Sequence, residues 1–250
     1  MKLESLNESS RVLEIRTLIQ SKKALHHFYS LSYEKYRQCL QLCPQEGSIL
    51  EIGSGAGFAK EFIPELCASD IIPYPNIDKV IDATRLSFED NSLRAIFLLN
   101  TFHHIPDVDK FLTEACRCLK PGGRILIIDQ HVGFISRIVL EYLHHEPFNP
   151  NSETWSFQSS GPLTGANGAL AWIVFERDKE RFEKKFSLLK LVSYSPHTPL
   201  LYWVSGGLKK WSMAPKILIP FWQFIDRLFL KISRDFGSFT DIEIYKRLEA

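Results

Sequence analysis

Three glycines at alternate positions carry the clearest chemical signal in the sequence. Gly53, Gly55 and Gly57 follow an apolar run over residues 49–52 that only Glu51 interrupts. Glycine tolerates positive φ and lets a ligand lie against bare main chain. We therefore expect a strand, a tight ligand-binding loop and then a helix whose first N–H groups point at the ligand.

Spacing separates the nucleotide-binding sites that begin in this way. The chain contains no Gly-x-x-x-x-Gly-Lys-Ser/Thr sequence, which a P-loop requires. A dinucleotide fingerprint, Gly-x-Gly-x-x-Gly, would need its third glycine where Phe58 stands. Phe58 thus disfavours a nicotinamide-dependent oxidoreductase, which stays an alternative at this point.

The sequence present is Glu-x-Gly-x-Gly-x-Gly, and it resembles motif I of the class I S-adenosylmethionine-dependent methyltransferases. The resemblance extends over residues 49–129, with later segments that match in order and spacing. These segments are residues 80–84, 93–105 and 119–129, and the second includes a His-His pair. The chain thus resembles the branch of the superfamily with such a pair after strand four, which implies S-adenosyl-L-methionine as the cofactor.

The resemblance also implies how the chain holds this cofactor. Asp70, nineteen positions after Glu51, would accept both ribose hydroxyls at the end of the second strand. Glu51 would lie near the methionyl amine, and Ile71 on the adenine. Two alternatives stay open: Glu51 satisfies N–H groups of the glycine loop, and Asp70 is an exposed turn residue.

Further cofactor contacts are implied by the later segments. Asp82 and Ala83 resemble the pair that meets the adenine edge, and Asn100 would face the methionyl part. The predicted cofactor site is therefore Glu51, Gly53, Ser54, Gly55, Gly57, Asp70, Ile71, Asp82, Ala83 and Asn100.

His103 and His104 are the candidates for a catalytic general base, because imidazole titrates near neutral pH. The alternative is that one of them only hydrogen-bonds main chain in a turn. No Asn/Asp-Pro-Pro-Tyr/Phe sequence follows strand four, which disfavours the amino-methyltransferases that act on nucleic-acid bases or glutamine, and O- or C-methylation is favoured. The acceptor is then a small molecule or a lipid- or glycan-linked group.

Methyl transfer from a sulfonium is an in-line displacement that needs alignment of donor and acceptor, and it requires no metal. We accordingly predict no metal ligands. Cys39 and Cys43 could start a zinc set, but no second pair or nearby histidine completes it, and a further possible set combines His131 with His144, His145 and Glu146. It is disfavoured because adjacent histidines on a helix point in different directions.

The order of apolar runs predicts an α/β fold of the Rossmann-like, three-layer type. Its sheet would have seven mostly parallel strands, an antiparallel last strand beside strand five, and helical insertions. Strands and helices should alternate over residues 48–129. The expected strands are residues 48–52, 66–69, 79–81, 94–99, 124–128, 188–193 and 239–245.

The 250 residues suit a single domain in four parts. A helical cap over 1–47 precedes the cofactor-binding core at 48–131. A helix and a lid loop come next, over 132–187. The last part, 188–250, contains strands six and seven and an inserted helical segment at 195–237.

Composition limits the partners and the compartment. A net charge of +1 with 24% charged residues argues against a nucleic-acid surface, which needs clustered Lys and Arg. Five cysteines, an odd number without a secreted-domain framework, fit a reducing cytoplasm. The sequence begins without a basic and apolar leader, and no apolar run is long enough to span a membrane.

Residues 200–234 are rich in aromatic and basic side chains, and two interpretations stay open. The segment packs on the domain as a lid, or it lies on the inner face of a membrane. A non-catalytic module that binds a partner through residues 195–237 is the alternative to an enzyme. The sequence does not indicate an oligomeric state.

Overall fold

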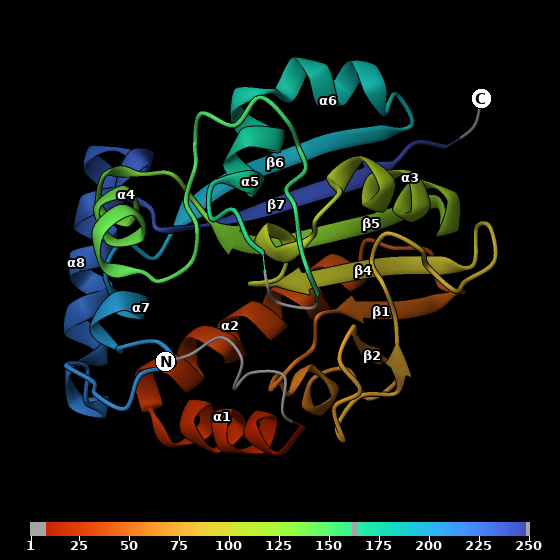
Figure 1. Ribbon diagram of the computed structural model, residues 1–250. Coiled ribbons are helices and arrows are strands. Elements are labelled where there is room, and N and C mark those ends of the chain that lie inside the picture. Colours follow the sequence, from red (N-terminus) through yellow and green to blue (C-terminus); the bar gives the residue numbers. More distant parts are fainter. Residues whose placement is uncertain (1–8, 162–164, 249–250) are drawn as a thin grey trace.

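The computed structural model describes residues 9–161 and 165–248, built around a seven-stranded sheet (Figure 1). The strand order is β3-β2-β1-β4-β5-β7-β6. The strands are β1 (Ser48–Ile52), β2 (Cys67–Asp70), β3 (Lys79–Val80), β4 (Leu93–Leu99), β5 (Leu119–Gln130), β6 (Leu189–His197) and β7 (Phe239–Lys246).

Strands β1 to β5 pair in parallel, and β7 runs antiparallel between β5 and β6. The predicted mostly parallel sheet with an antiparallel last strand beside strand five is therefore confirmed. Both β5 and β6 are longer than predicted. Because the first five strands are parallel, their carboxyl ends meet at one edge of the sheet, where α/β folds bind ligands.

Both faces of the sheet are covered, which explains the continuous apolar runs of its central strands. In β4, Phe97 faces α2 (Lys23–Leu40), where it stacks on Tyr36 with ring centroids 4.2 Å apart. Ile96 and Leu98 point to the other face of the sheet. They belong to the hydrophobic core there, which includes the buried residues of α3 (Val108–Cys118). Two short helices, α5 (Leu170–Trp172) and α6 (Lys179–Lys185), pack on that same face. The three-layer prediction is confirmed.

The predicted alternation of strands and helices over residues 48–129 is wrong. In this range the structure has one α-helix, α3, and the glycine loop leads only into a 3-10 turn, η2 (Ala59–Glu61). Pro64 disfavours helical geometry in the residue before it, so a longer helix cannot extend through this segment. The N-terminal helix α2 packs on one face of the sheet against β4 and β5.

Several of the remaining helices, α8 among them, lie beyond the carboxyl ends of the parallel strands (Figure 1). They include α4 (Phe134–Ile138), which continues as a π-helical turn, η4 (Val139–Leu143), and ends before residues 144–147. No described helix is both long and apolar enough to cross a membrane. The other segments are α1 (Ser9–Ser21), η3 (Phe102–His104), η5 (Ile173–Arg177), α7 (Leu201–Val204), η6 (Lys216–Leu218), α8 (Ile219–Ile232) and η7 (Arg234–Phe236).

Candidate functional site

A cleft of about 1670 Å³ lies at the carboxyl ends of β1, β2 and β4. All of the site residues predicted from the sequence line it, so the fold brings them together from separate segments. They are Glu51, Gly53, Ser54, Gly55, Gly57, Asp70, Ile71, Asp82, Ala83, Asn100, His103 and His104. Their individual roles stay predictions.

The glycine loop has a backbone that other residues would not adopt. Gly53 has a φ of +71°, and a Cβ there would lie 2.2 Å from the Thr101 side chain. Gly55 has a φ of +46°, but a Cβ on it would meet no protein atom closer than 3.9 Å, because the residue borders open cleft. The loop thus passes close to the end of β4 and exposes main chain to the cleft.

The main-chain N–H groups of the loop are largely used within the protein. Gly55 donates to Asp70 Oδ2 at 3.0 Å, and Gly57 donates to the Ser54 carbonyl at 2.7 Å. Phe58 donates to the Tyr33 hydroxyl at 3.1 Å. The prediction that a helix N-terminus offers its N–H groups to the ligand is wrong, since η2 is a single turn.

Asp70 ends β2 and is buried, so the alternative of an exposed turn aspartate is wrong. Its Oδ1 accepts the Ile72 N–H at 3.1 Å, while Oδ2 accepts the N–H of Gly55. Burial raises the pKa of this carboxyl, and these hydrogen bonds oppose the rise. Each carboxylate oxygen has a second lone pair, so Asp70 can still accept from a ligand. The adjacent Ile71 is 42% exposed on the cleft wall, an apolar surface available to a flat ring.

Glu51 is a buried acid at the base of the cleft, 3% exposed. Burial raises its pKa to about 7, against the effect of a hydrogen bond from Ser54, and the nearby Asp70 charge adds to the rise. No cation of the described chain is among the groups that shift this pKa. The site therefore contains a carboxylate without a positive partner.

Asp82, Ala83 and Asn100 line the cleft at two further strand ends. The Asp82 Oδ1 accepts both the N–H and the hydroxyl of Thr84 at 2.8 Å, which fixes the carboxyl in a tight turn. Asn100 has a φ of 52°, and its buried Oδ1 has no hydrogen-bond partner in the described part of the chain. A bound donor is the natural complement of such an oxygen.

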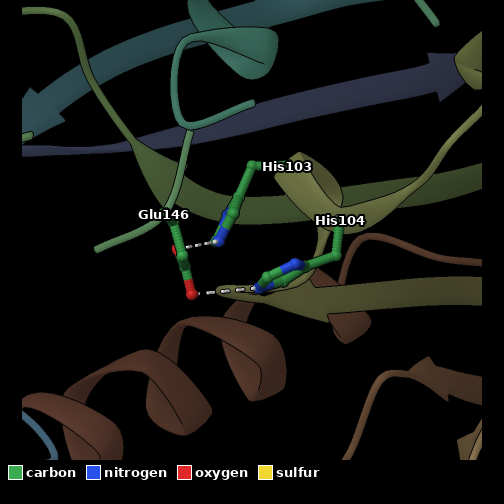
Figure 2. A group of neighbouring side chains, drawn as sticks. All are labelled: His103, His104 and Glu146. Atoms are coloured by element: carbon green, nitrogen blue, oxygen red, sulfur yellow. Dashed lines mark ion pairs between the residues drawn. The ribbon is translucent and has the colours of Figure 1, made fainter. Parts of the chain in front are cut away.

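The two histidines lie on η3 and meet Glu146, which follows η4 (Figure 2). His103 Nε2 is 3.3 Å from Glu146 Oε2, and His104 Nε2 is 3.6 Å from Glu146 Oε1. On the other side of each ring, His103 Nδ1 lies 2.6 Å from Asp129 Oδ1, and His104 Nδ1 lies 3.3 Å from the Gly165 carbonyl oxygen.

This environment gives the two histidines different charge states: His103 is protonated at neutral pH, and His104 is neutral. Burial alone would lower the pKa of His103, but the carboxylates of Asp129 and Glu146 raise it to about 10. Burial and the charge on His103 lower the pKa of His104 to about 4. At pH 7 His104 is therefore the neutral member, and a general base needs a free lone pair. The Nδ1 contact of His104 with main chain also matches the turn alternative.

The sequence does not predict that Asp129 and Glu146 lie beside the His pair. It groups Glu146 only with His144, His145 and His131, in the disfavoured metal set. His144 Nδ1 does lie 3.6 Å from Glu146 Oε2, but His131 Nδ1 contacts the Tyr194 hydroxyl at 2.8 Å.

The outer wall of the cleft is partly apolar and comes from segments without motifs. Its apolar residues lie on η4, on the loop before α5, on α7 and on the segment after α7. These residues include Val139, Leu143, Phe157, Trp203, Leu208 and Trp211. The sequence indicated a lid loop and an aromatic segment that includes Trp203 and Trp211, but it did not place Val139, Leu143 or Phe157 at the cleft.

The chain has relatives among known proteins. Residues 50–127 match the family described as "Methyltransferase domain". A 48-residue stretch is 42% identical to phosphoethanolamine N-methyltransferase 2 of Caenorhabditis elegans, covering 19% of this chain and 11% of that protein. A stretch of the same length is 46% identical to the ubiquinone/menaquinone biosynthesis C-methyltransferase UbiE of Brucella canis, covering 19% and 18%. The chain thus spans less than a fifth of the length of these relatives.

Among solved structures, the chain is similar to geranyl diphosphate C-methyltransferase from Streptomyces coelicolor A3(2), at 15% identity and a TM-score of 0.49. The similarity covers 90% of this chain and 82% of that one. Haemonchus contortus phosphoethanolamine N-methyltransferase 2, in complex with S-adenosyl-L-methionine, shows 18% identity and a TM-score of 0.44 over 85% and 53%.

Proposed function

We propose that this chain transfers a methyl group from S-adenosyl-L-methionine to a small or lipid-linked acceptor. Its residues 50–127 match the methyltransferase domain family. The observation that supports this most directly is the pair of buried acids on either side of the glycine loop. Glu51 and Asp70 line one cleft and are separated by main chain that carries no side chain at Gly53 and Gly55.

Each part of the cofactor has a complementary group in this cleft. Asp70 accepts from the ribose hydroxyls while it also holds the N–H of Gly55. Glu51 and the unpaired Oδ1 of Asn100 receive the methionyl ammonium, a cation that the described chain does not supply. Ile71 lies against one face of the adenine, and Asp82 with Ala83 meets its edge. A charged hydrogen bond is the strongest of these contacts.

The reaction needs close alignment and little else. An electron pair of the acceptor, a lone pair on oxygen or the π pair of an electron-rich carbon, forms a bond to the methyl carbon, and the carbon–sulfur bond breaks with its electrons on sulfur. The acceptor loses a proton, and S-adenosyl-L-homocysteine remains. Ligand sites are typically about 300–1,000 Å³, so the cleft of about 1670 Å³ has room for cofactor and acceptor together.

The acceptor side of the cleft favours an apolar molecule. Val139, Leu143 and Trp211 line it, and Leu143 and Trp211 are also exposed at the surface. The apolar wall therefore continues from the cleft to the outside of the protein. We propose a hydrophobic or lipid-linked acceptor that enters along this wall, modified on oxygen or carbon.

Helix α8 has an exposed apolar side. Phe221, Phe224, Leu228 and Ile232 follow one another at intervals of three and four residues, and all are exposed, with Ile232 at 74%. The opposite side of α8 packs on the domain, where buried Asp226 accepts the Leu200 N–H at 2.7 Å. The helix is thus attached on one side and apolar on the other.

A second apolar stripe lies on the neighbouring helix. Phe134, Ile138 and Tyr142 are exposed along α4 and η4, and Phe134 packs on Phe236, which in turn packs on Phe229 of α8. The segment from α7 through α8 also carries exposed basic residues: Lys209, Lys210, Lys216, Arg227 and Lys231. Apolar stripes together with basic residues are typical of segments that lie on anionic lipid. We propose that α4 and α8 contact an anionic membrane surface.

Calorimetry with S-adenosyl-L-methionine and S-adenosyl-L-homocysteine tests the cofactor assignment. Binding is expected with the wild-type chain, and Asp70→Asn should weaken it by about 10- to 100-fold, since hydrogen bonds to charged groups contribute roughly 1.5–3 kcal/mol. The exposed acid Asp235 provides the control, and Asp235→Asn should bind as the wild type does. Absence of binding by the wild type would refute the function, and an unchanged Asp70→Asn would refute the ribose assignment.

Flotation with vesicles of phosphatidylcholine and phosphatidylglycerol tests the lipid surface. The wild type should float with the vesicles, and less so at high salt. Phe221→Ser combined with Phe224→Ser should reduce flotation. The control pair, Leu13→Ser with Leu31→Ser, removes side chains of similar exposure from α1 and α2 and should leave flotation unchanged. Equal loss in both pairs, or no flotation of the wild type, would contradict the proposal.

A further inference from the structure

His103, His104 and Glu146 form a three-ligand group on the wall of the cleft (Figure 2). One donor atom from each residue lies within 4.8 Å of the other two. Two imidazoles and one carboxylate that converge in this way are a common ligand set for divalent first-row transition ions. We propose that this group binds such an ion, with Zn²⁺ as its best-suited member.

The orientation of the rings supports a metal site. Each Nδ1 faces an oxygen acceptor, Asp129 Oδ1 at 2.6 Å for His103 and the Gly165 carbonyl at 3.3 Å for His104. An Nδ1–H that donates to oxygen leaves Nε2 to act as the metal ligand, and in His103 the ion displaces the proton that Nε2 carries in the metal-free protein. Metal-bound histidines are oriented in this way by carboxylates and carbonyls behind them. Here both rings are so held, and both turn Nε2 to the same carboxylate (Figure 2).

The distances are close to those of a coordination shell. With bonds of roughly 2.0–2.2 Å, neighbouring ligands of a tetrahedral zinc lie about 3.4 Å apart. The two imidazole-to-carboxylate distances are 3.3 and 3.6 Å. The outer limit of 4.8 Å means that the group must close slightly around an ion. The two contacts go to different carboxylate oxygens, Oε2 for His103 and Oε1 for His104, so binding of an ion through one oxygen needs a shift of the side chains.

The local charges are compatible with a cation. Asp129 is fully buried behind His103, and Glu146 is mostly buried between the two rings. Both carboxylates are thus available to neutralise a divalent ion. The competing interpretation is an ion-pair cluster without metal, in which Glu146 ties residues 144–146 to η3.

The place of the ion gives it a role that rests on the proposed function. Three protein ligands leave at least one coordination position, and all three residues border the cleft that also contains Asn100. An acceptor hydroxyl bound at that position would lose its proton to water more readily, because the ion stabilises the oxyanion. The oxygen lone pair would then attack the methyl carbon. The expected acceptor is therefore one with a metal-binding hydroxyl or phenol.

Metal binding is tested on the full chain without any methyl-transfer assay. The protein is stripped with a chelator, then titrated with Zn²⁺ by calorimetry and with Co²⁺ by visible absorption. We expect one ion per chain and absorption bands of Co²⁺ bound to nitrogen and oxygen. His104→Ala and Glu146→Gln should each weaken Zn²⁺ binding by at least about tenfold. His145→Ala is the matched control, since His145 is exposed on the same loop and lies outside the group.

Two results would overturn the proposal. One is the absence of stoichiometric binding by the stripped wild type. The other is binding that survives in both His104→Ala and Glu146→Gln, as it would if Cys39 and Cys43 held the ion. Thermal unfolding of each variant checks that a loss of binding is not a loss of fold. Zn²⁺ binding without any cofactor binding would refute the proposed methyl transfer and leave the metal site standing.

Discussion

Replacement of Glu51 by Gln should stabilise the cofactor-free protein while it weakens cofactor binding. Glutamine keeps the shape of the side chain and removes its charge. Glu51 is 3% exposed, and burial holds its pKa at about 7, above the ordinary value of 4.5. An ionised carboxylate in this place therefore works against folding, and the neutral amide avoids that cost.

The size and sign of this effect come from the pKa shift. A raised carboxyl pKa means that the native state binds the proton more tightly than the unfolded chain does. The wild type should thus lose stability as the pH rises from about 4.5 to about 7, and remain level above that. The shift corresponds to about 3 kcal/mol at pH 8 and to less than about 1 kcal/mol at pH 5.

Urea denaturation of wild type and Glu51→Gln at pH 5 and pH 8 measures the difference. We expect Glu51→Gln to be more stable by about 3 kcal/mol at pH 8, with little gain at pH 5. The exposed Glu89 gives the control, since Glu89→Gln should change stability by less than about 0.5 kcal/mol at either pH. A variant that is neutral or destabilised at pH 8 would refute the argument that the charge is costly.

Cofactor binding supplies the second half of this prediction. An ammonium group binds the ionised form of Glu51, so wild-type affinity should rise about tenfold between pH 6 and pH 8, with proton release at the lower pH. Glu51→Gln should bind more weakly and without this pH dependence. Calorimetry in buffers of different ionisation enthalpy measures both, and equal pH profiles would show that Glu51 does not meet the cofactor amine.

Two further substitutions test the glycine loop by urea denaturation. Gly53→Ala should cost about 3 kcal/mol, because the new Cβ would lie 2.2 Å from Thr101, whereas Gly122→Ala should cost only about 1 kcal/mol, because it shares the positive φ but meets no atom closer than 3.4 Å. Equal losses of stability in the two variants would show that the Thr101 side chain moves away from the new Cβ at little cost. Tyr33→Phe should cost about 1–3 kcal/mol, because the buried N–H of Phe58 loses its acceptor, and a neutral result would mean that water replaces the hydroxyl.

The strands were predictable because burial on two faces leaves a strong pattern in the sequence. β1 and β4 are continuous apolar runs, and β7 alternates because it lies antiparallel near the edge of the sheet. β5 begins five residues before its apolar part, in the stretch 119–123 that contains Pro and two Gly, so its start was missed. β6 is an edge strand and extends through polar residues, because a strand that is exposed along one side needs no continuous hydrophobic pattern. Its end was therefore not predictable from the sequence.

The helices were less predictable, because tertiary contacts decide whether they form. After the glycine loop, Phe58 is fixed by the Tyr33 hydroxyl and Pro64 prevents a longer helix, so the chain makes one 3-10 turn. In α8 the sequence is apolar nearly all round, and it gives no indication of which side faces the domain. Buried Asp226, which accepts main-chain N–H groups of Leu200 and Leu201, defines the inner side.

The same distinction applies to the site. Asp129 could have been paired with the His pair, because Ile128 lies beside Leu99 in parallel register, and polar residues at the ends of neighbouring strands must meet. Glu146 could not have been paired with the His pair from the sequence. The chain reaches His103 again only after η4 and a turn, and no periodic pattern links residues 43 positions apart. The cofactor side is thus built from strand ends, which the sequence reveals. The acceptor side is built from connecting segments, and for that reason metal binding and lipid contact need experiments on the folded chain.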